Sequence, residues 1–158
     1  MTQLYIKERV FSWTDQFSVM DETGNPKYTV EGEFFSWGKK LHVYDRNGNE
    51  AAFIKQELFT LLPRFTVYSG GREIGAVQKE LSLFIPRYSI TGLGWEIEGS
   101  FWEHEFRIVR NGRVIATMEK QWMTWGDSYL LTVADSADEI PALAVVLAID
   151  CVAEQRDN

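Results

Sequence analysis

The stretch Ile140-Pro-Ala-Leu-Ala-Val-Val-Leu-Ala-Ile149 decides the fold of this 158-residue chain, because it contains no polar side chain. A helix on a protein surface has an apolar stripe and a polar face, so a helix that is apolar all round must be buried on all sides. A helix that crosses a bilayer needs about 20 such residues, and this run is shorter. The sequence therefore predicts a buried helix over residues 139–155, surrounded by a wall that the preceding residues must form.

The linker before this helix contains two alternative start signals. Asp138 is the preferred N-cap, because it places Pro141 at the third helical position, where the missing N–H is tolerated. The alternative is a capping box made of Ser136 and Glu139, which would place Pro141 deeper inside the helix.

The rest of the chain carries a repeated spacing that indicates hairpins. Six residues after each of four turn glycines stands an apolar residue, and eleven residues further on stands another large one. The four sets are Gly24, Val30 and Leu41; Gly48, Ile54 and Phe65; Gly71, Val77 and Tyr88; and Gly112, Met118 and Tyr129. The same eleven-residue step joins Ile6 to Phe17, and a shortened version joins Ile97 to Phe106. The chain therefore contains six units of one design between residues 4 and 134.

Each unit has the pattern of two antiparallel strands. The segment Lys40-Leu-His-Val-Tyr44 alternates apolar with other residues, which is typical of a strand with one covered face. The turns, such as Asn111-Gly112 and Gly70-Gly71, contain residues that tolerate the positive φ of tight hairpins. Six such units predict about twelve strands, nearly all joined by hairpins.

The width of such a sheet and the apolar helix fit each other. Closing the sheet into a barrel removes its exposed edges, and a twelve-stranded barrel is roughly 24 Å across. Side chains fill a barrel of about eight strands but leave a gap in a wider one, and a helix about 10–12 Å wide matches that gap. We therefore predict a mainly β fold in one domain, residues 1–158: a closed antiparallel barrel of about twelve strands (residues 4–134) around a buried C-terminal hydrophobic α-helix.

Composition limits the classes of partner and compartment. The net charge of −7 argues against a nucleic-acid partner, which requires a basic surface. The only cysteine, Cys151, excludes an internal disulfide and suits a reducing compartment. The first ten residues contain Lys7, Glu8 and Arg9 and no apolar run, so we expect no signal peptide and a cytoplasmic protein.

This arrangement of hairpin repeats and a terminal apolar helix resembles the LURP-one-related family of the tubby C-terminal-like superfamily. The resemblance covers essentially the whole chain. It is carried by Phe17-Ser-Val with Asp21-Glu-Thr-Gly-Asn-Pro26, Val30-Glu-Gly-Glu-Phe-Phe35, Asp45-Arg-Asn-Gly-Asn49 and residues 142–150. It implies a twelve-stranded barrel around a central helix. Among related proteins, tubby domains bind phosphoinositides, phospholipid scramblases act at membranes, and plant LURP-one-related proteins are tied to defence. This chain departs from the tubby pattern in being acidic and short.

No motif predicts catalysis, a metal site or a cofactor. Asp45-Arg-Asn-Gly-Asn49 resembles the start of a calcium loop, but Gln56 stands where a bidentate glutamate is needed, so a hairpin turn is favoured. The two histidines, His42 and His104, have no nucleophile or metal-ligand spacing beside them and are interpreted as solvated surface residues. We therefore expect a protein that is not an enzyme.

Two polar residues of the predicted helix need an explanation. Cys151 has apolar neighbours and is interpreted as a small core residue. Asp150 is expected to reach the barrel mouth or to pair with a basic residue there, because a buried unpaired charge is very unfavourable; a ligand or proton role is the alternative.

A candidate anion site follows from the repeat. Lys40, Arg64 and Arg87 each directly precede the large residue that ends the eleven-residue step, so they should point outward at equivalent heights on alternate strands. With Lys39 beside them, they could bind a lipid phosphate or a similar headgroup. Solvated strand ends are the alternative interpretation.

Large apolar residues should gather at the barrel end opposite the glycine turns. They are Trp13, Trp37, Leu61, Phe84 and Trp125, with Phe11, Phe35, Phe59 and Met123 nearby. We expect them to close the core over that mouth. The alternative is an exposed rim, marked by Trp13, Trp37 and Trp125, that meets a membrane interface or a protein partner.

These observations favour a non-enzymatic binding or scaffold domain that contacts membrane lipid headgroups or a protein partner. The alternative is a small-molecule carrier or enzyme that uses a barrel cavity, which would require the helix to pack outside the barrel. A purely structural partner of another polypeptide is the third possibility. The sequence itself does not identify the ligand.

Overall fold

The computed structural model describes residues 1–7, 16–33, 37–84, 87–100, 105–123 and 126–155. In these ranges the chain forms twelve strands, a short 3-10 helix η1 (Ser136–Asp138) and one α-helix, α1 (Glu139–Glu154). The strands are β1 (Thr2–Lys7), β2 (Gln16–Met20), β3 (Pro26–Gly32), β4 (Lys40–Tyr44), β5 (Glu50–Gln56), β6 (Arg64–Ser69), β7 (Arg72–Glu80), β8 (Arg87–Thr91), β9 (Glu96–Ser100), β10 (Glu105–Arg110), β11 (Arg113–Met123) and β12 (Gly126–Val133).

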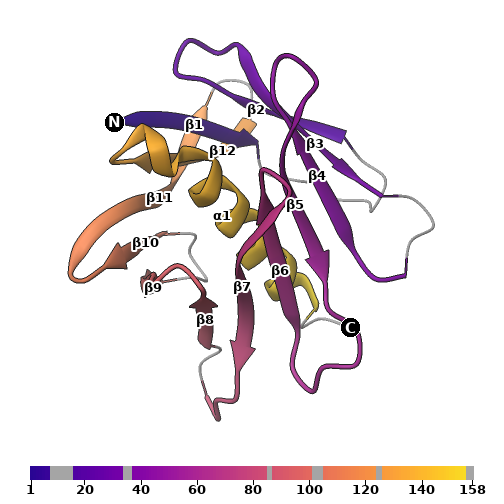
Figure 1. Ribbon diagram of the computed structural model, residues 1–158. Helices are drawn as coiled ribbons and strands as arrows, with labels where there is room; N and C mark the ends of the chain where they lie inside the picture. Colours follow the sequence, from indigo (N-terminus) through magenta and orange to yellow (C-terminus); the bar gives the residue numbers. More distant parts are fainter. Residues whose placement is uncertain (8–15, 34–36, 85–86, 101–104, 124–125, 156–158) are drawn as a thin grey trace.

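The strands form one antiparallel sheet that curls around α1 (Figure 1). The order in the sheet is β8-β7-β6-β5-β4-β3-β2-β1-β12-β11-β10-β9, so strands that follow one another in sequence are neighbours, except β8 and β9. The pairing of β1 with β12, from Thr2 opposite Val133 to Lys7 opposite Ser128, joins the first and last strands of the chain. The predicted twelve-stranded barrel around a terminal helix is confirmed.

The barrel is nearly closed, with one seam between β8 and β9. Within the described ranges, no ladder joins these two strands, which stand at the two ends of the sheet order. A Cβ on Gly75 of β7 would lie 2.2 Å from the carbonyl oxygen of Thr91, so the end of β8 crowds against β7. Trp95, between β8 and β9, is buried in the core. The wall is therefore closed except between β8 and β9, where the described residues form no ladder.

The residues of the predicted repeat form the inner face of the wall. Val30, Leu41, Ile54, Phe65 and Val77 are all buried in the core. The ladders align successive units, with Leu41 opposite Ile54 and Phe65 opposite Val77. The positions of the repeat are therefore those whose side chains point toward the barrel axis.

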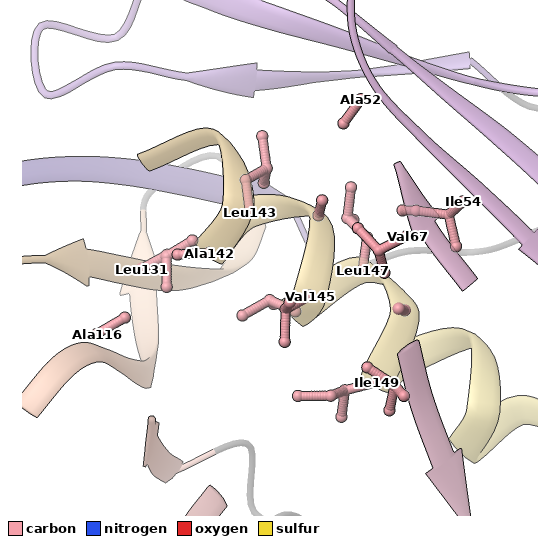
Figure 2. Packing of buried hydrophobic residues seen from close by; sticks show 14 of the residues in the cluster. Ala52, Ile54, Val67, Ala116, Leu131, Ala142, Leu143, Val145, Leu147 and Ile149 are labelled. Carbon is pink, nitrogen blue, oxygen red and sulfur yellow. The ribbon is translucent and has the colours of Figure 1, made fainter. Parts of the chain in front are cut away.

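The helix α1 fills that axis. All residues from Ala142 to Ile149 are buried, as are Cys151 and Val152. Its side chains point in several directions toward the surrounding strands, with contacts to β5, β6, β7 and β12 (Figure 2). Because apolar neighbours surround the helix, it needs no polar face. The prediction of a buried helix, and of Cys151 as a core residue, is confirmed.

The helix α1 starts where the preferred alternative predicted, but its N-cap residue does not form the side-chain hydrogen bond that a cap normally provides. Asp138 is the N-cap residue and Pro141 is at the third helical position, yet the Asp138 side chain makes no capping hydrogen bond. Asp135 instead accepts a 2.9 Å bond from the N–H of Ala137 and caps η1. Glu139, which the capping box would have used, turns into the barrel wall.

The two ends of α1 identify the two ends of the barrel. At the helix start, Glu139 contacts Lys27 and Tyr28 beside the turn at Gly24, which defines the glycine-turn end. At the helix end, the Gln155 side chain accepts a 3.3 Å hydrogen bond from Gln56 Nε2 at the end of β5. We call this opposite end, formed by the β3–β4 (33–39), β5–β6 (57–63) and β7–β8 (81–86) connections, the loop end.

Candidate functional site

The loop end exposes large apolar side chains on three neighbouring connections. Six of them have exposed fractions between 84% and 102%. They are Trp37 in the β3–β4 connection, Phe59 and Leu61 in the β5–β6 connection, and Leu81, Leu83 and Phe84 in the β7–β8 connection. We call these six residues the apolar tips. Patches of this kind on a folded protein mark interaction sites.

The tips belong to adjacent loops. The strands β3 to β8 are consecutive neighbours in the sheet, so the three connections follow one another along the rim. A Cβ placed on Gly38 would lie 3.0 Å from Leu58 Cδ2, which shows that the first two connections touch. The N–H of Lys79 donates a 2.9 Å bond to the carbonyl of Pro63 and joins the second connection to β7.

The backbone of Phe59 is strained, and burial of its side chain does not offset this strain. Its φ is +63°, in the left-handed region that glycine and asparagine adopt more readily than bulky residues. Its side chain is also fully exposed, so burial does not repay this strain. Strained positions of this kind are frequent at functional sites.

Basic residues surround the tips. Residues 33–40, 55–64 and 79–87 contain six basic and three acidic side chains, whereas the whole chain has a net charge of −7. Five of the six lie at or next to the end of a strand directly behind the tips: Lys40, Lys55, Arg64, Lys79 and Arg87. We call these five the basic collar. The loop end is therefore the positive region of an acidic protein.

Three members of the collar are the residues that the sequence singled out. Lys40, Arg64 and Arg87 each open their strand at the loop end. Arg87 is exposed, while Arg64 Nη1 donates a 2.8 Å hydrogen bond to Gln78 and Lys40 Nζ lies 3.8 Å from Glu33 Oε1. In the ladders Lys40 is level with Thr66, two residues from Arg64, which is the stagger that tilted barrel strands require.

Lys39, predicted from the sequence to lie beside them, is buried and does not share their outer face. Its exposed fraction is 2%. The inward residues of this segment are Leu41 and Val43, so period-2 alternation places Lys39 on the inner side as well. Gln56 holds its backbone, because the Lys39 N–H donates to Gln56 Oε1 and the Gln56 N–H donates to the Lys39 carbonyl, each at 2.9 Å.

The expectation that the large apolar residues close the core is wrong for Trp37, Leu61 and Phe84, whose side chains are exposed. Trp13 and Trp125 lie outside the described residues. Sequence reasoning missed Leu81 and Leu83. The available signal was Leu81-Ser-Leu-Phe-Ile-Pro86, an apolar segment that ends in Pro-Arg like Leu62-Pro63-Arg64 and does not alternate as a strand would.

His42 points outward, as predicted. Its ring contacts two carboxylates, whereas a freely solvated side chain was expected. Its Nδ1 lies 3.0 Å from Glu50 Oε2 and its Nε2 lies 3.0 Å from Glu33 Oε2. Its ring stacks on Phe53 with centroids 4.8 Å apart. Burial lowers the pKa of His42, but the hydrogen bonds to both carboxylates prevail and hold that pKa above its ordinary 6.5. His104 lies outside the described residues.

The Asp45 segment has a structural explanation. Asp45 Oδ1 accepts from the N–H groups of Asn47 and Asn49 at 2.9 and 3.0 Å, so this segment is the predicted hairpin turn. Among the described residues, no group of His, Cys, Asp and Glu could hold a metal ion. Asp150 is half-buried near the end of α1. In the same part of the chain, no helix has the length and hydropathy that crossing a membrane requires.

Comparisons with known proteins agree with this fold. The sequence model of the LURP-one-related family matches residues 2–150. The chain is 36% identical to the protein YxjI of Bacillus subtilis (strain 168) over 152 residues. The aligned region covers 96% of this chain and 94% of that protein. The X-ray structure of a protein from Arabidopsis thaliana superimposes with a TM-score of 0.66 at 15% identity, covering 95% of this chain and 90% of that one.

Proposed function

This chain belongs to the LURP-one-related family, and we propose that it is a non-enzymatic binding domain that docks on a membrane surface through the loop end of its barrel. The observation that carries this proposal is the set of six apolar tips, which are exposed on three adjacent loops with five basic residues on the strands behind them. The family and the barrel fold are consistent with a binding domain, and both the binding role and the partner are what we propose.

The shape of the tips favours a bilayer over a protein partner. A protein interface buries its apolar residues in a shaped, complementary surface. Here the apolar side chains project separately from three loops, and one of them, Phe59, is held outward by a strained backbone. A bilayer accepts such projections without shape complementarity, and Trp, Phe and Leu are the residues that insert at its interface.

The charges favour an anionic headgroup layer. Basic residues near a negatively charged leaflet attract it, with about 1 kcal/mol for each Lys or Arg at the surface. The collar residues lie two to four residues from the nearest apolar tip in sequence. When the tips enter the apolar layer, the collar is at the level of the lipid phosphates. The proposed headgroup contacts are Lys40, Arg64 and Arg87, with Lys55 and Lys79.

The interior of the barrel is a less suitable site for a ligand. The side chains from Ala142 to Val152 occupy the axis and are almost all buried. A carrier or enzyme of the calyx type needs that space to be free. We therefore place binding on the outside, at the loop end. The single cysteine is buried inside α1, which suits the reducing cytoplasm that we propose as its compartment.

Sedimentation with lipid vesicles tests the function. Wild-type protein should sediment with phosphatidylcholine vesicles that contain phosphatidylglycerol, and a Trp37→Ala/Leu61→Ala/Phe84→Ala variant should not. Val114→Ala is the matched control, because Val114 is a partly exposed apolar residue beside the Gly112 turn at the opposite end. It should bind like the wild type.

The collar has its own variant. A Lys40→Ala/Arg64→Ala/Arg87→Ala protein should bind the anionic vesicles up to about 100-fold more weakly, as three surface charges predict. A wild-type protein that ignores vesicles of both compositions, or a triple tip variant that binds as well as the wild type, would refute membrane docking.

A further inference from the structure

Glu33 lies between two cationic groups at the base of the β3–β4 connection. Its Oε2 is 3.0 Å from His42 Nε2, and its Oε1 is 3.8 Å from Lys40 Nζ. The second ring nitrogen of His42 is 3.0 Å from Glu50 Oε2. A neutral imidazole has one N–H and one lone pair, so only the protonated ring donates to both carboxylates. The geometry of this cluster is therefore that of a histidinium ion.

The surroundings of His42 are mainly acidic. The charged and titratable groups that share its outer face come from three strands and the first connection. They are Glu31 of β3, Glu33 of the β3–β4 connection, Lys40 and Tyr44 of β4, and Glu50 and Lys55 of β5. The same contact with His42 holds the pKa of Glu33 below its ordinary value. Three carboxylates surround the ring. When His42 loses its proton, the positive charge that neutralises part of their negative charge is lost.

We propose that His42 and Glu33 form a proton switch that controls docking of the loop end on anionic membranes, with docking stronger in acid. This inference rests on the proposed function. When His42 is protonated, it holds Glu33 at 3.0 Å, while Lys40 stays farther from that carboxylate, at 3.8 Å, and can turn to a lipid phosphate. When His42 loses its proton, the nearer of the two cations beside Glu33 is gone. The Glu33 carboxylate then pairs with Lys40. The rim that carries Trp37 then has one positive charge fewer.

The expected effect has a defined size. One elementary charge at an anionic lipid surface changes binding by about fivefold. Lys40 is one of five collar residues, so the switch adjusts affinity and does not abolish it. The apolar contribution of the tips does not change with pH, because these side chains do not titrate.

Vesicle binding at two pH values tests the switch. The probe is phosphatidylcholine vesicles containing phosphatidylglycerol, whose charge is constant near neutral pH, compared at about pH 6 and about pH 8.5. Wild-type protein should bind about three- to fivefold more tightly at the lower pH. His42→Gln should bind weakly at both. Glu33→Gln should bind tightly at both, because the carboxylate that competes for Lys40 is gone. His104→Gln, at the other histidine of the sequence, should respond like the wild type.

The outcomes separate this inference from the proposed function. If His42→Gln binds vesicles and keeps the full pH response, the switch is refuted while membrane docking stands. If the wild type binds no vesicles at either pH, both proposals are refuted. Should His42→Gln fail to show a cooperative melt, Glu33→Gln decides alone, and a retained pH response in that variant overturns the switch.

Discussion

The Tyr28 hydroxyl donates a 2.5 Å hydrogen bond to Glu139 Oε2, and so joins β3 of the wall to the first residue of the central helix. Lys27 Nζ lies 2.9 Å from the same carboxylate, whose residue is 5% exposed. A buried carboxylate is costly unless it is paired and hydrogen-bonded. This contact therefore fixes where the otherwise apolar helix begins along the barrel axis.

Removal of this hydroxyl should destabilise the whole barrel. Tyr28→Phe leaves the buried carboxylate with one donor fewer, and a hydrogen bond to a charged group contributes about 1.5–3 kcal/mol. The free energy of unfolding, measured by urea denaturation near pH 7, should fall by that amount. In a double-mutant cycle with Glu139→Gln the losses should be less than additive, because both changes break the same contact. Strictly additive losses would show that the two residues are not coupled.

The same carboxylate predicts a loss of stability in acid. Burial raises the pKa of Glu139, but the hydrogen bonds from Tyr28 and Lys27 prevail and hold that pKa below its ordinary 4.5. A group whose pKa is lower in the folded state stabilises the protein above its unfolded pKa, and this contribution disappears as the pH falls through the folded value. The wild type should therefore lose stability below about pH 4.5 more steeply than Glu139→Gln. Parallel stability curves for the two proteins would contradict this assignment.

One substitution at two positions should separate the core from the docking surface. Leu147 of α1 is 2% exposed and Leu61 of the β5–β6 connection is 99% exposed. Leu147→Ala should lower the free energy of unfolding by about 2–5 kcal/mol. Leu61→Ala should change it by no more than about 0.5 kcal/mol, yet should weaken vesicle binding. Thermal melts and vesicle sedimentation on both variants check this, and a large loss of stability from Leu61→Ala would place that side chain in the core.

The parts of the fold that the sequence predicted are those that depend on periodicity. In aqueous solution, an uninterrupted apolar run such as residues 142–149 is stable only when it is buried inside the protein. The spacing from Val30 to Leu41 fixes which face of each strand is covered. Burial on the inner face follows from these patterns alone. This is why the helix, its start at Glu139 and the strand pairing could be predicted.

The candidate site depended on information that periodicity does not carry. An apolar residue in a connection, such as Leu61 or Phe84, can fold back over the core or remain in solvent, and its spacing is the same in both cases. Lys39 precedes the strand β4, and hydrogen bonds of its backbone with Gln56, seventeen residues away, are what extend the alternation of Leu41 and Val43 to it. The His42 network joins three separate segments through Glu33 and Glu50, so only the folded barrel brings these charges together.

The central claim is that the apolar tips enter a bilayer, and a polarity-sensitive fluorophore at Leu61→Cys tests it most directly. The natural thiol, Cys151, is buried, so labelling of the folded protein is directed to the introduced cysteine. The matched control is Asn47→Cys in the exposed turn at the opposite end of the barrel. On addition of phosphatidylglycerol-containing vesicles, the emission of the label at position 61 should shift to the blue and increase, while the label at position 47 stays unchanged. If the protein sediments with the vesicles but the label at position 61 keeps its emission in water, the loop end does not enter the membrane and the account is contradicted.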